Sequence, residues 1–150
     1  MLLCRRPDAV PAGLEFVPLQ QDAAVIVATT GHPLLMPGCV PTLAQVASQL
    51  WIEPRPELAI HAVFTAFFER AGVVPRRCRL ASAAPPMPLL IAVMHAQQAL
   101  AMVPLTLANW YLQHGHFQRV AIESPGSFAP IGAIVRAQGP GRDFLDWLCR

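Results

Sequence analysis

The chain has 150 residues, which suits one domain with a core of ordinary size. Apolar residues make up 54% of the chain and charged residues only 13%, which excludes a disordered tail. The net charge is +2. A protein that grips duplex DNA by itself usually carries a denser basic stripe, so the composition does not favour that class.

The first third of the chain alternates β-branched segments with an amphipathic segment. Residues 14–19 and 23–29 are predicted strands, and the second segment is rich in β-branched residues. Thr42 and Gln45 have the spacing of a capping box, which predicts a helix over residues 42–50. The residues directly after this helix, Trp-Ile-Glu, predict a short strand.

Residues 57–71 predict a helix with a broad apolar stripe. Pro56 suits the first helical position, and Glu57 suits the positive end of the helix dipole. Gly72 suits a left-handed cap after the last turn. The stripe consists of Ile60, Val63, Phe64, Phe67, Phe68 and Ala71.

The arginines after this helix allow two interpretations. Arg76, Arg77 and Arg79 can contact phosphate, or they can form the solvated face of a strand. We favour the second interpretation because most exposed charge has a structural origin.

The rest of the chain continues to alternate strands and helices. The predicted strands are 78–83, 100–104, 117–122 and 130–137, and the predicted helices are 88–99, 105–115 and 142–150. Strands that alternate with helices require crossover connections, so the sequence predicts an α/β fold with a mostly parallel sheet.

Two features bear on the cellular compartment. The long apolar stretch 85–112 contains four prolines and several polar residues, so we expect no membrane span. Nothing at the N-terminus marks secretion. The four cysteines, Cys4, Cys39, Cys78 and Cys149, show no C-x-x-C spacing, and we expect them to be reduced and buried in a cytoplasmic protein.

No motif points to catalysis, a metal or a cofactor. His114 and His116 are two histidines near a helix end, and a zinc site needs at least three protein ligands. Asp143 and Asp146 fall on the polar face of a predicted helix. The sequence has no G-x-S-x-G and no phosphate-binding loop. We therefore expect no enzymatic activity.

Several stretches together resemble the effector-binding domain of bacterial LysR-type transcriptional regulators. In family order they are "GLEFVPLQQDAAVIVATTGHPL", "TLAQVASQLWIEP", "FTAFFERAGVVPRRC", "AMVPLTLA", "PIGAIVR" and "RDFLDWLCR". In that family the "AGxxP" turn joins a helix to a strand of the second lobe. The resemblance therefore supports the structural interpretation of the arginine run.

The resemblance implies a periplasmic-binding-protein-like fold with two lobes and two crossing strands. Residues 1–35 would be a remnant of the first lobe with the first crossing strand. Residues 36–122 would form the complete second lobe. Residues 123–150 would contain the return crossing strand and a C-terminal helix of the first lobe.

The match also departs from the family in two places. Family members carry a winged helix-turn-helix and the opening of the first lobe before this point. The chain is therefore expected to be N-terminally truncated and not to bind DNA directly. The family usually has two glycines where Gln97 and Ala99 stand, so this helix-to-strand joint is expected to differ in shape.

By the same resemblance, an effector would contact Gln20, Leu58, Ala59, Ile60 and Ile131. Some relatives have an arginine near Gln20 that pairs with a carboxylate effector, and the uncharged Gln20 argues against an acidic effector here. The alternative is that Leu58, Ile60 and Ile131 are simply core residues.

The resemblance also implies a surface for self-association. In the family, the phenylalanine-rich helix packs across a dimer against a first-lobe helix that belongs to the missing segment. Phe64, Phe67 and Phe68 are therefore expected to include exposed apolar surface at an oligomer interface.

The sequence thus predicts a small-molecule-sensing fragment of a LysR-type regulator whose effector is unidentified. The main alternative is a ligand-free module that associates with itself or with full-length LysR-type relatives. A small enzyme is a more remote third possibility.

Overall fold

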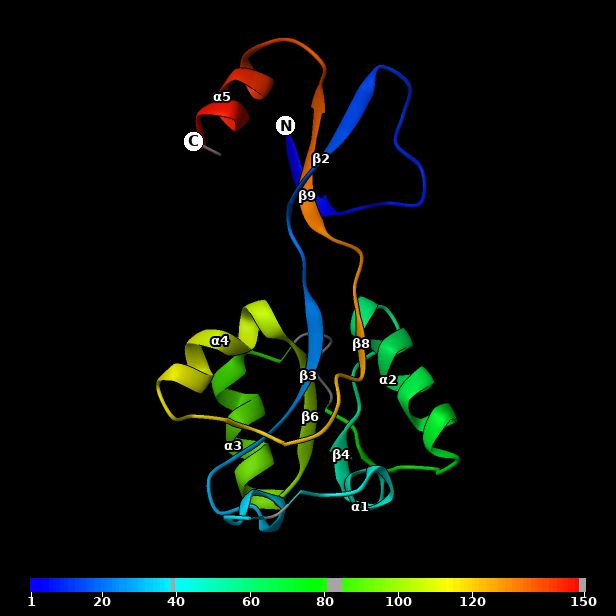
Figure 1. The fold of residues 1–150 in the computed structure, drawn as a ribbon, viewed down its shortest axis with the longest axis vertical. Helices are drawn as coiled ribbons and strands as arrows, with labels where there is room; N and C mark the ends of the chain where they lie inside the picture. Colours follow the sequence, from blue (N-terminus) through cyan, green and yellow to red (C-terminus); the bar gives the residue numbers. More distant parts are fainter. Residues whose placement is uncertain (39, 81–84, 149–150) are drawn as a thin grey trace. The chain divides into compact units, whose positions relative to one another are not determined.

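The computed structural model describes residues 1–38, 40–80 and 85–148 (Figure 1). The chain folds into two compact units, one formed by Met1–Asp22 with Ala129–Arg150 and the other by Ala23–Phe128. The chain passes from one unit to the other twice, after Asp22 and after Phe128. The residues 23–35 and 123–128, expected to lie outside the second lobe, thus belong to the second compact unit.

The first unit is a three-stranded antiparallel sheet with one helix. The strands β1 (Leu2–Arg5), β9 (Ile131–Arg136) and β2 (Leu14–Gln20) lie in the order β1-β9-β2. The helix α5 (Pro140–Leu148) contributes the buried Leu145, which clusters with Ala133 and Val135 of β9.

The second unit is built on a six-stranded sheet. Its strands lie in the order β5-β4-β6-β3-β7, and β8 also pairs with β3. They are β3 (Ala23–Ala28), β4 (Leu50–Ile52), β5 (Arg76–Cys78), β6 (Leu100–Pro104), β7 (Gln118–Arg119) and β8 (Gly126–Ser127). The helices are a 3-10 turn η1 (Pro33–Leu35), α1 (Leu43–Ala47), α2 (Ala59–Ala71), α3 (Met87–Gln97) and α4 (Leu105–Gln113).

This sheet is covered by helices on both faces (Figure 1). Successive strand residues point to opposite faces, so the central strand β3 divides its side chains between two cores. Ala24, Ile26 and Ala28 pack with residues of α1 and α2. Val25 and Val27 pack with residues of α3 and α4. Burial on both faces explains why β3 reads as a continuous apolar run.

The expected mostly parallel sheet is wrong for the described residues. Only β4 pairs in parallel, with β5 and β6, whereas the other five strand pairs are antiparallel. Alternating strands and helices identify the crossovers that make β4, β5 and β6 parallel. They do not reveal the direction of β3, the strand on which the chain enters this unit.

The ends of α1 and α2 test the capping residues and the helix start that the sequence predicted. The capping box is confirmed: Thr42 Oγ1 accepts from the Gln45 amide at 3.2 Å, and Gln45 Oε1 accepts from the Thr42 amide at 2.8 Å. Gly72 is the predicted left-handed cap, with φ +63°. The start of α2 is corrected from residue 57 to Ala59, because the segment after Pro56 forms a turn in which the Leu58 amide donates to the Arg55 carbonyl.

The predicted strand over residues 78–83 begins earlier than expected. The strand β5 covers Arg76–Cys78 and pairs with β4. Residues 81–83 of the expected strand lie outside the described residues. The cysteines Cys4 and Cys78 are free but only half-buried, which corrects the expectation of full burial for these two.

The joint between α3 and β6 places its left-handed residue at Gln98, with φ +48° and ψ +45°. The Ala99 amide donates to the Met94 carbonyl at 3.0 Å, which closes the helix end in the manner of a Schellman motif. Gln97 is the last residue of the helix itself. The conformation that favours glycine is therefore adopted by Gln98, which lies between the two positions singled out in the sequence. A difference in shape between this joint and that of the family stays a prediction.

We expect Gln98→Gly to stabilise the protein by about 1 kcal/mol, because glycine adopts the left-handed conformation without the steric cost of a Cβ atom. The matched control is Gln97→Gly, which places glycine in the last helical turn and is expected to cost about 0.5–1 kcal/mol. Urea denaturation followed by far-UV circular dichroism measures both changes. Equal effects of the two substitutions would contradict this assignment of the strained residue.

Within the described residues, no helix is both long and apolar enough to cross a membrane.

Candidate functional site

Two of the predicted ligand-binding residues are neighbours in the first unit. Gln20 is the last residue of β2, Ile131 is the first residue of β9, and the two are paired across the sheet. Ile131 is also paired with Arg5, the last residue of β1. These three residues therefore form one row at the end of the sheet from which the chain leaves for the second unit.

A register shift between Pro18 and Gln20 contributes to this arrangement. Such an irregularity inserts an extra residue into one strand and re-aims the side chains that follow it. Here it lets Gln20, rather than Leu19, oppose Ile131. Gln20 is exposed and Ile131 is half-buried, so the row presents an amide group beside an apolar side chain.

The other three predicted residues lie at the start of α2 in the second unit. Leu58 is the N-terminal cap residue and is 39% exposed, and Ala59 is also exposed. No side chain caps this end of the helix. Ile60 is buried and belongs to the core cluster that contains Trp51, so for Ile60 the burial agrees with the alternative of a core residue.

The structure therefore groups these residues as a pair and a triplet in separate units. The arrangement of all five around one cleft stays a prediction. The pairing within the first unit and the exposure of Leu58 and Ala59 are compatible with it.

Arg5 is a residue near this row that the sequence analysis did not single out. Its Nη2 donates to Asp22 Oδ2 at 2.6 Å, and its Nη1 donates to the Ala129 carbonyl at 3.2 Å. The Asp22 side chain is fully buried. The signal available in the sequence was Asp22, a lone acid between two predicted strands. A carboxylate that becomes buried there requires a partner such as an arginine.

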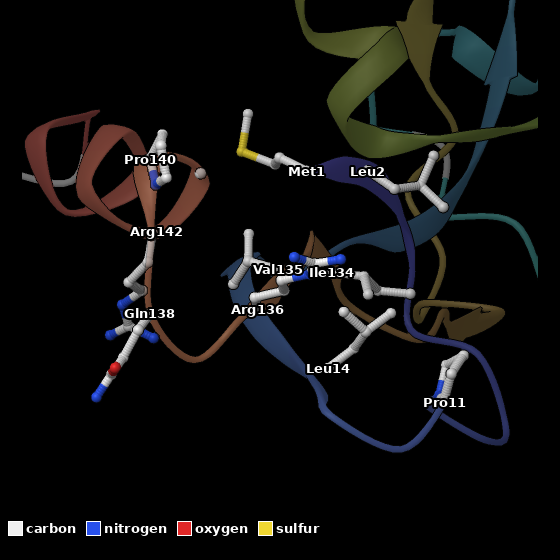
Figure 2. A pocket seen from close by; sticks show the side chains of 12 residues that line it. Met1, Leu2, Pro11, Leu14, Ile134, Val135, Arg136, Gln138, Pro140 and Arg142 are labelled. Atoms are coloured by element: carbon white, nitrogen blue, oxygen red, sulfur yellow. The ribbon is translucent and has the colours of Figure 1, made fainter.

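A cavity of the first unit with a volume of about 630 Å³ lies elsewhere (Figure 2). It opens between the end of the sheet and the start of α5. Its lining includes Met1, Leu2, Leu14, Ile134, Arg136 and Arg142. None of the predicted ligand-binding residues lines this cavity.

A cavity of about 500 Å³ lies beside α2 in the second unit. Its lining includes Glu53, His61, Phe64, Phe68 and Arg77. This cavity also excludes the start of α2, where Leu58 and Ala59 are found.

The arginine run forms ion pairs along a strand. Glu53 accepts hydrogen bonds from Arg77, at 2.6 Å, and from Arg79. The hydrogen bond from Arg79, with that from Arg77, holds the pKa of the Glu53 carboxyl below its ordinary value. Because both guanidinium groups share one acid, the geometry supports the structural interpretation rather than a phosphate-binding patch.

The histidine pair after α4 packs on an aromatic side chain. His114 stacks on Trp110 with ring centroids 4.1 Å apart, and His116 lies parallel to the same indole at 5.7 Å. The His114 ring nitrogen Nδ1 is 2.7 Å from the Trp110 carbonyl. Among the described residues, no group of three or more histidine, cysteine or acidic side chains is arranged to hold a metal.

The expectation that part of the phenylalanine cluster is exposed is wrong. Phe64, Phe67 and Phe68 are all buried and surround Trp51, with ring centroids 5.2–5.7 Å from the indole. Helix α2 turns its aromatic stripe toward the sheet, because this is where the large apolar area is removed from water. An oligomer interface through these three rings therefore loses its physical basis.

The comparisons with known proteins identify the family. The family described as LysR substrate binding domain matches residues 1–150. No curated protein sequence matches the chain significantly.

Solved structures of LysR regulatory domains have the same fold. The regulatory domain of MetR from N. meningitidis is 18% identical, with a TM-score of 0.63, and the match covers 98% of this chain and 65% of that one. The CcmR regulatory domain from Synechocystis PCC6803, in complex with 2-PG, is 15% identical with a TM-score of 0.71, covering 98% and 70%. The effector binding domain of QuiR in complex with shikimate is 16% identical with a TM-score of 0.68, covering 99% and 69%.

The chain thus spans about two thirds of the length of these regulatory domains. The mixed α/β fold agrees with theirs, and the family match extends over every residue of the sequence. The chain belongs to the LysR substrate-binding domain family.

Proposed function

We propose that this chain senses a small-molecule effector for a LysR-type regulator, at a site formed by Gln20, Ile131 and the start of α2 from Leu58 to Ile60. The observation that carries the proposal is the family match over residues 1–150. The complexes of CcmR with 2-PG and of QuiR with shikimate support it, because those similar domains bind small molecules. Effector binding would be relayed to a DNA-binding domain of the regulator.

The residues at this site favour an effector with an uncharged polar group. The Gln20 amide offers one acceptor and two donors but no charge. The Arg5 guanidinium in the same row forms an ion pair with Asp22, so its charge is compensated within the protein. Leu58 and Ile131 add apolar surface. A carboxylate effector would find no uncompensated cation in this row, whereas an amide or hydroxyl would find hydrogen-bonding partners.

A thermal-shift screen tests this function with paired small molecules, each a carboxylic acid and its primary amide. A ligand present at 100 times its Kd stabilises the folded state by about 2.7 kcal/mol. For a domain of this size that is a rise in Tm on the order of 10 °C. We expect stabilisation by the amide member of at least one pair, with the acid less effective.

The matched variants are Gln20→Ala and Gln21→Ala, two adjacent exposed glutamines of which only Gln20 is assigned to the site. We expect Gln20→Ala to weaken binding of the stabilising compound about tenfold, because the effector loses a hydrogen bond. Gln21→Ala should leave the affinity unchanged. Equal loss in both variants, measured by isothermal titration calorimetry, would reject the site.

The second candidate function is association with another copy of the chain. The observation that favours it is a group of exposed large apolar side chains in the first unit. They are Met1, Leu2, Leu3, Leu14, Phe144 and Trp147. If no compound stabilises the chain and sedimentation velocity shows a concentration-dependent dimer, this second function is the better description.

A further inference from the structure

The two segments that connect the units interrupt the strand pairing. On the first-unit side, the ladder between β2 and β9 ends at Gln20 and Ile131. On the second-unit side, the ladder between β3 and β8 begins at Ala23 and Ser127. Residues 21–22 and 128–130 lie between the two ladders and belong to neither. These residues are also where the chain passes from one unit to the other.

Contacts from β1 bridge this interruption. The Arg5 guanidinium reaches both connecting segments, through Asp22 on one and the Ala129 carbonyl on the other. The backbone continues the contact, since the Arg6 amide donates to the Pro130 carbonyl at 2.9 Å. Arg5 itself is paired with Ile131 in the sheet. One residue of β1 thus contacts both connections at the point where each leaves the sheet.

Because of burial, removing one partner of this ion pair costs more than it would at an exposed surface pair. The Asp22 side chain is fully buried and the Arg5 side chain is 27% exposed. An exposed pair contributes little, but breaking a buried pair leaves an uncompensated charge out of water. The planar guanidinium also presents several donors in a fixed geometry, which allows it to serve two acceptors at once.

We propose that Arg5 is a positioning residue that holds both connecting segments against β1 and thereby fixes the backbone that carries Gln20 and Ile131. The proposal rests on the proposed function for the role of those two residues in effector binding. Its consequence is preorganisation: an effector would meet Gln20 and Ile131 already in place. Ordering them would then add nothing to the cost of binding.

Hydrogen exchange measured by mass spectrometry tests the proposal on the ligand-free chain. In Arg5→Met, which keeps an unbranched side chain but removes the donors, we expect exchange to rise about tenfold or more in peptides covering residues 19–23 and 127–132. Peptides covering residues 24–28 of β3 and residues 100–104 of β6 in the second unit should be unchanged. The segment 127–132 is the more informative of the two, because Ala129 is more than 120 positions from Arg5 in the sequence.

The matched control is Arg142→Met, which removes another arginine of the same unit whose side chain also contacts two acceptors, here the acids Glu15 and Asp146. We expect no change in the connecting segments of this variant. If Arg5→Met leaves them unchanged, or if Arg142→Met opens them equally, Arg5 has no special role.

Arg5→Lys is a second variant for the same hydrogen-exchange measurement, for use if Arg5→Met fails to fold. Lysine keeps a charge for Asp22 but lacks the two-pronged geometry that also reaches Ala129. We expect protection near residues 19–23 to persist, while residues 127–132 exchange faster. Wild-type protection in both segments of Arg5→Lys would overturn the proposal. Because no effector is used, these outcomes are independent of the thermal-shift screen.

Discussion

Replacing Gly132 by alanine is expected to destabilise the first unit by about 3–5 kcal/mol, because the added methyl group has no space. A Cβ atom at Gly132 would lie 2.3 Å from the Val17 carbonyl oxygen and 2.4 Å from the Phe16 ring. Both neighbours belong to β2, which pairs with β9 along this stretch. The carbonyl oxygen cannot move away unless the strand moves with it.

The Phe16 ring also has little freedom to withdraw. It packs over the glycine, with the Arg6 guanidinium carbon 5.9 Å from the ring centroid. Moving the ring would disturb this cation–π contact, and moving the strand would break the ladder that holds Gln20 opposite Ile131. The cost therefore reaches the candidate site as well as the stability of the sheet.

Gly141→Ala is the matched control for this substitution. Gly141 lies in α5 of the same unit, and the nearest atom to an added Cβ would be 3.6 Å away, an ordinary contact. Since alanine favours the helix over glycine, we expect this variant to be neutral or to gain about 0.5–1 kcal/mol. Urea denaturation by circular dichroism compares the two. A loss of less than about 1 kcal/mol in Gly132→Ala would contradict the prediction, because it would mean that β2 and β9 move apart at little cost.

Features that depend on neighbouring residues could be predicted from the sequence. The capping box of Thr42 and Gln45 and the left-handed cap at Gly72 are both present, because each involves residues a few positions apart. The strands β2 and β3 also fall where the sequence predicted them. The start of α2 was missed by two residues, because a proline followed by an acid also suits a turn.

Features that depend on distant pairing could not be obtained from the residues alone. Nothing in the sequence indicates that Arg5 is the partner of Asp22, and their ion pair exists because the sheet order β1-β9-β2 brings both connecting segments next to β1. Gln20 and Ile131 are 111 positions apart, and only the family resemblance suggested that they belong together. Their direct pairing agrees with that part of the resemblance. The direction in which α2 turns its phenylalanines likewise depends on the sheet beneath it.

The aromatic cluster under α2 is the second place where a single substitution should have a large effect. Phe67 is 1% exposed and its ring centroid lies 5.7 Å from that of Trp51. It also meets Phe68 edge-on at 5.1 Å. The Trp51 indole is fixed in turn by a hydrogen bond from its Nε1 to the Val46 carbonyl at 3.1 Å. The ring therefore joins the packing of α2 to that of α1 and β4.

We expect Phe67→Ser to destabilise the second unit by about 4 kcal/mol or more. The change removes a buried ring and leaves a cavity, which by itself costs about 3–5 kcal/mol in comparable cores. It also places a hydroxyl group in apolar surroundings, where an unpaired polar group costs about 1–3 kcal/mol. Since most domains have only about 5–15 kcal/mol of stability, a large part of it would be lost.

The control and the sedimentation behaviour of this variant distinguish a core residue from an interface residue. Ala66→Ser places the same serine on the exposed side of α2, one position away, and is expected to cost no more than about 0.5 kcal/mol. If Phe67 lay at a surface between two copies, Phe67→Ser would keep its fold and shift the chain toward monomer in sedimentation velocity. Its burial beside Trp51 predicts the opposite: a lower denaturation midpoint at every protein concentration, and no folded monomer gained. A folded Phe67→Ser variant of wild-type stability would contradict the core role of Phe67 and support a role at an oligomer interface.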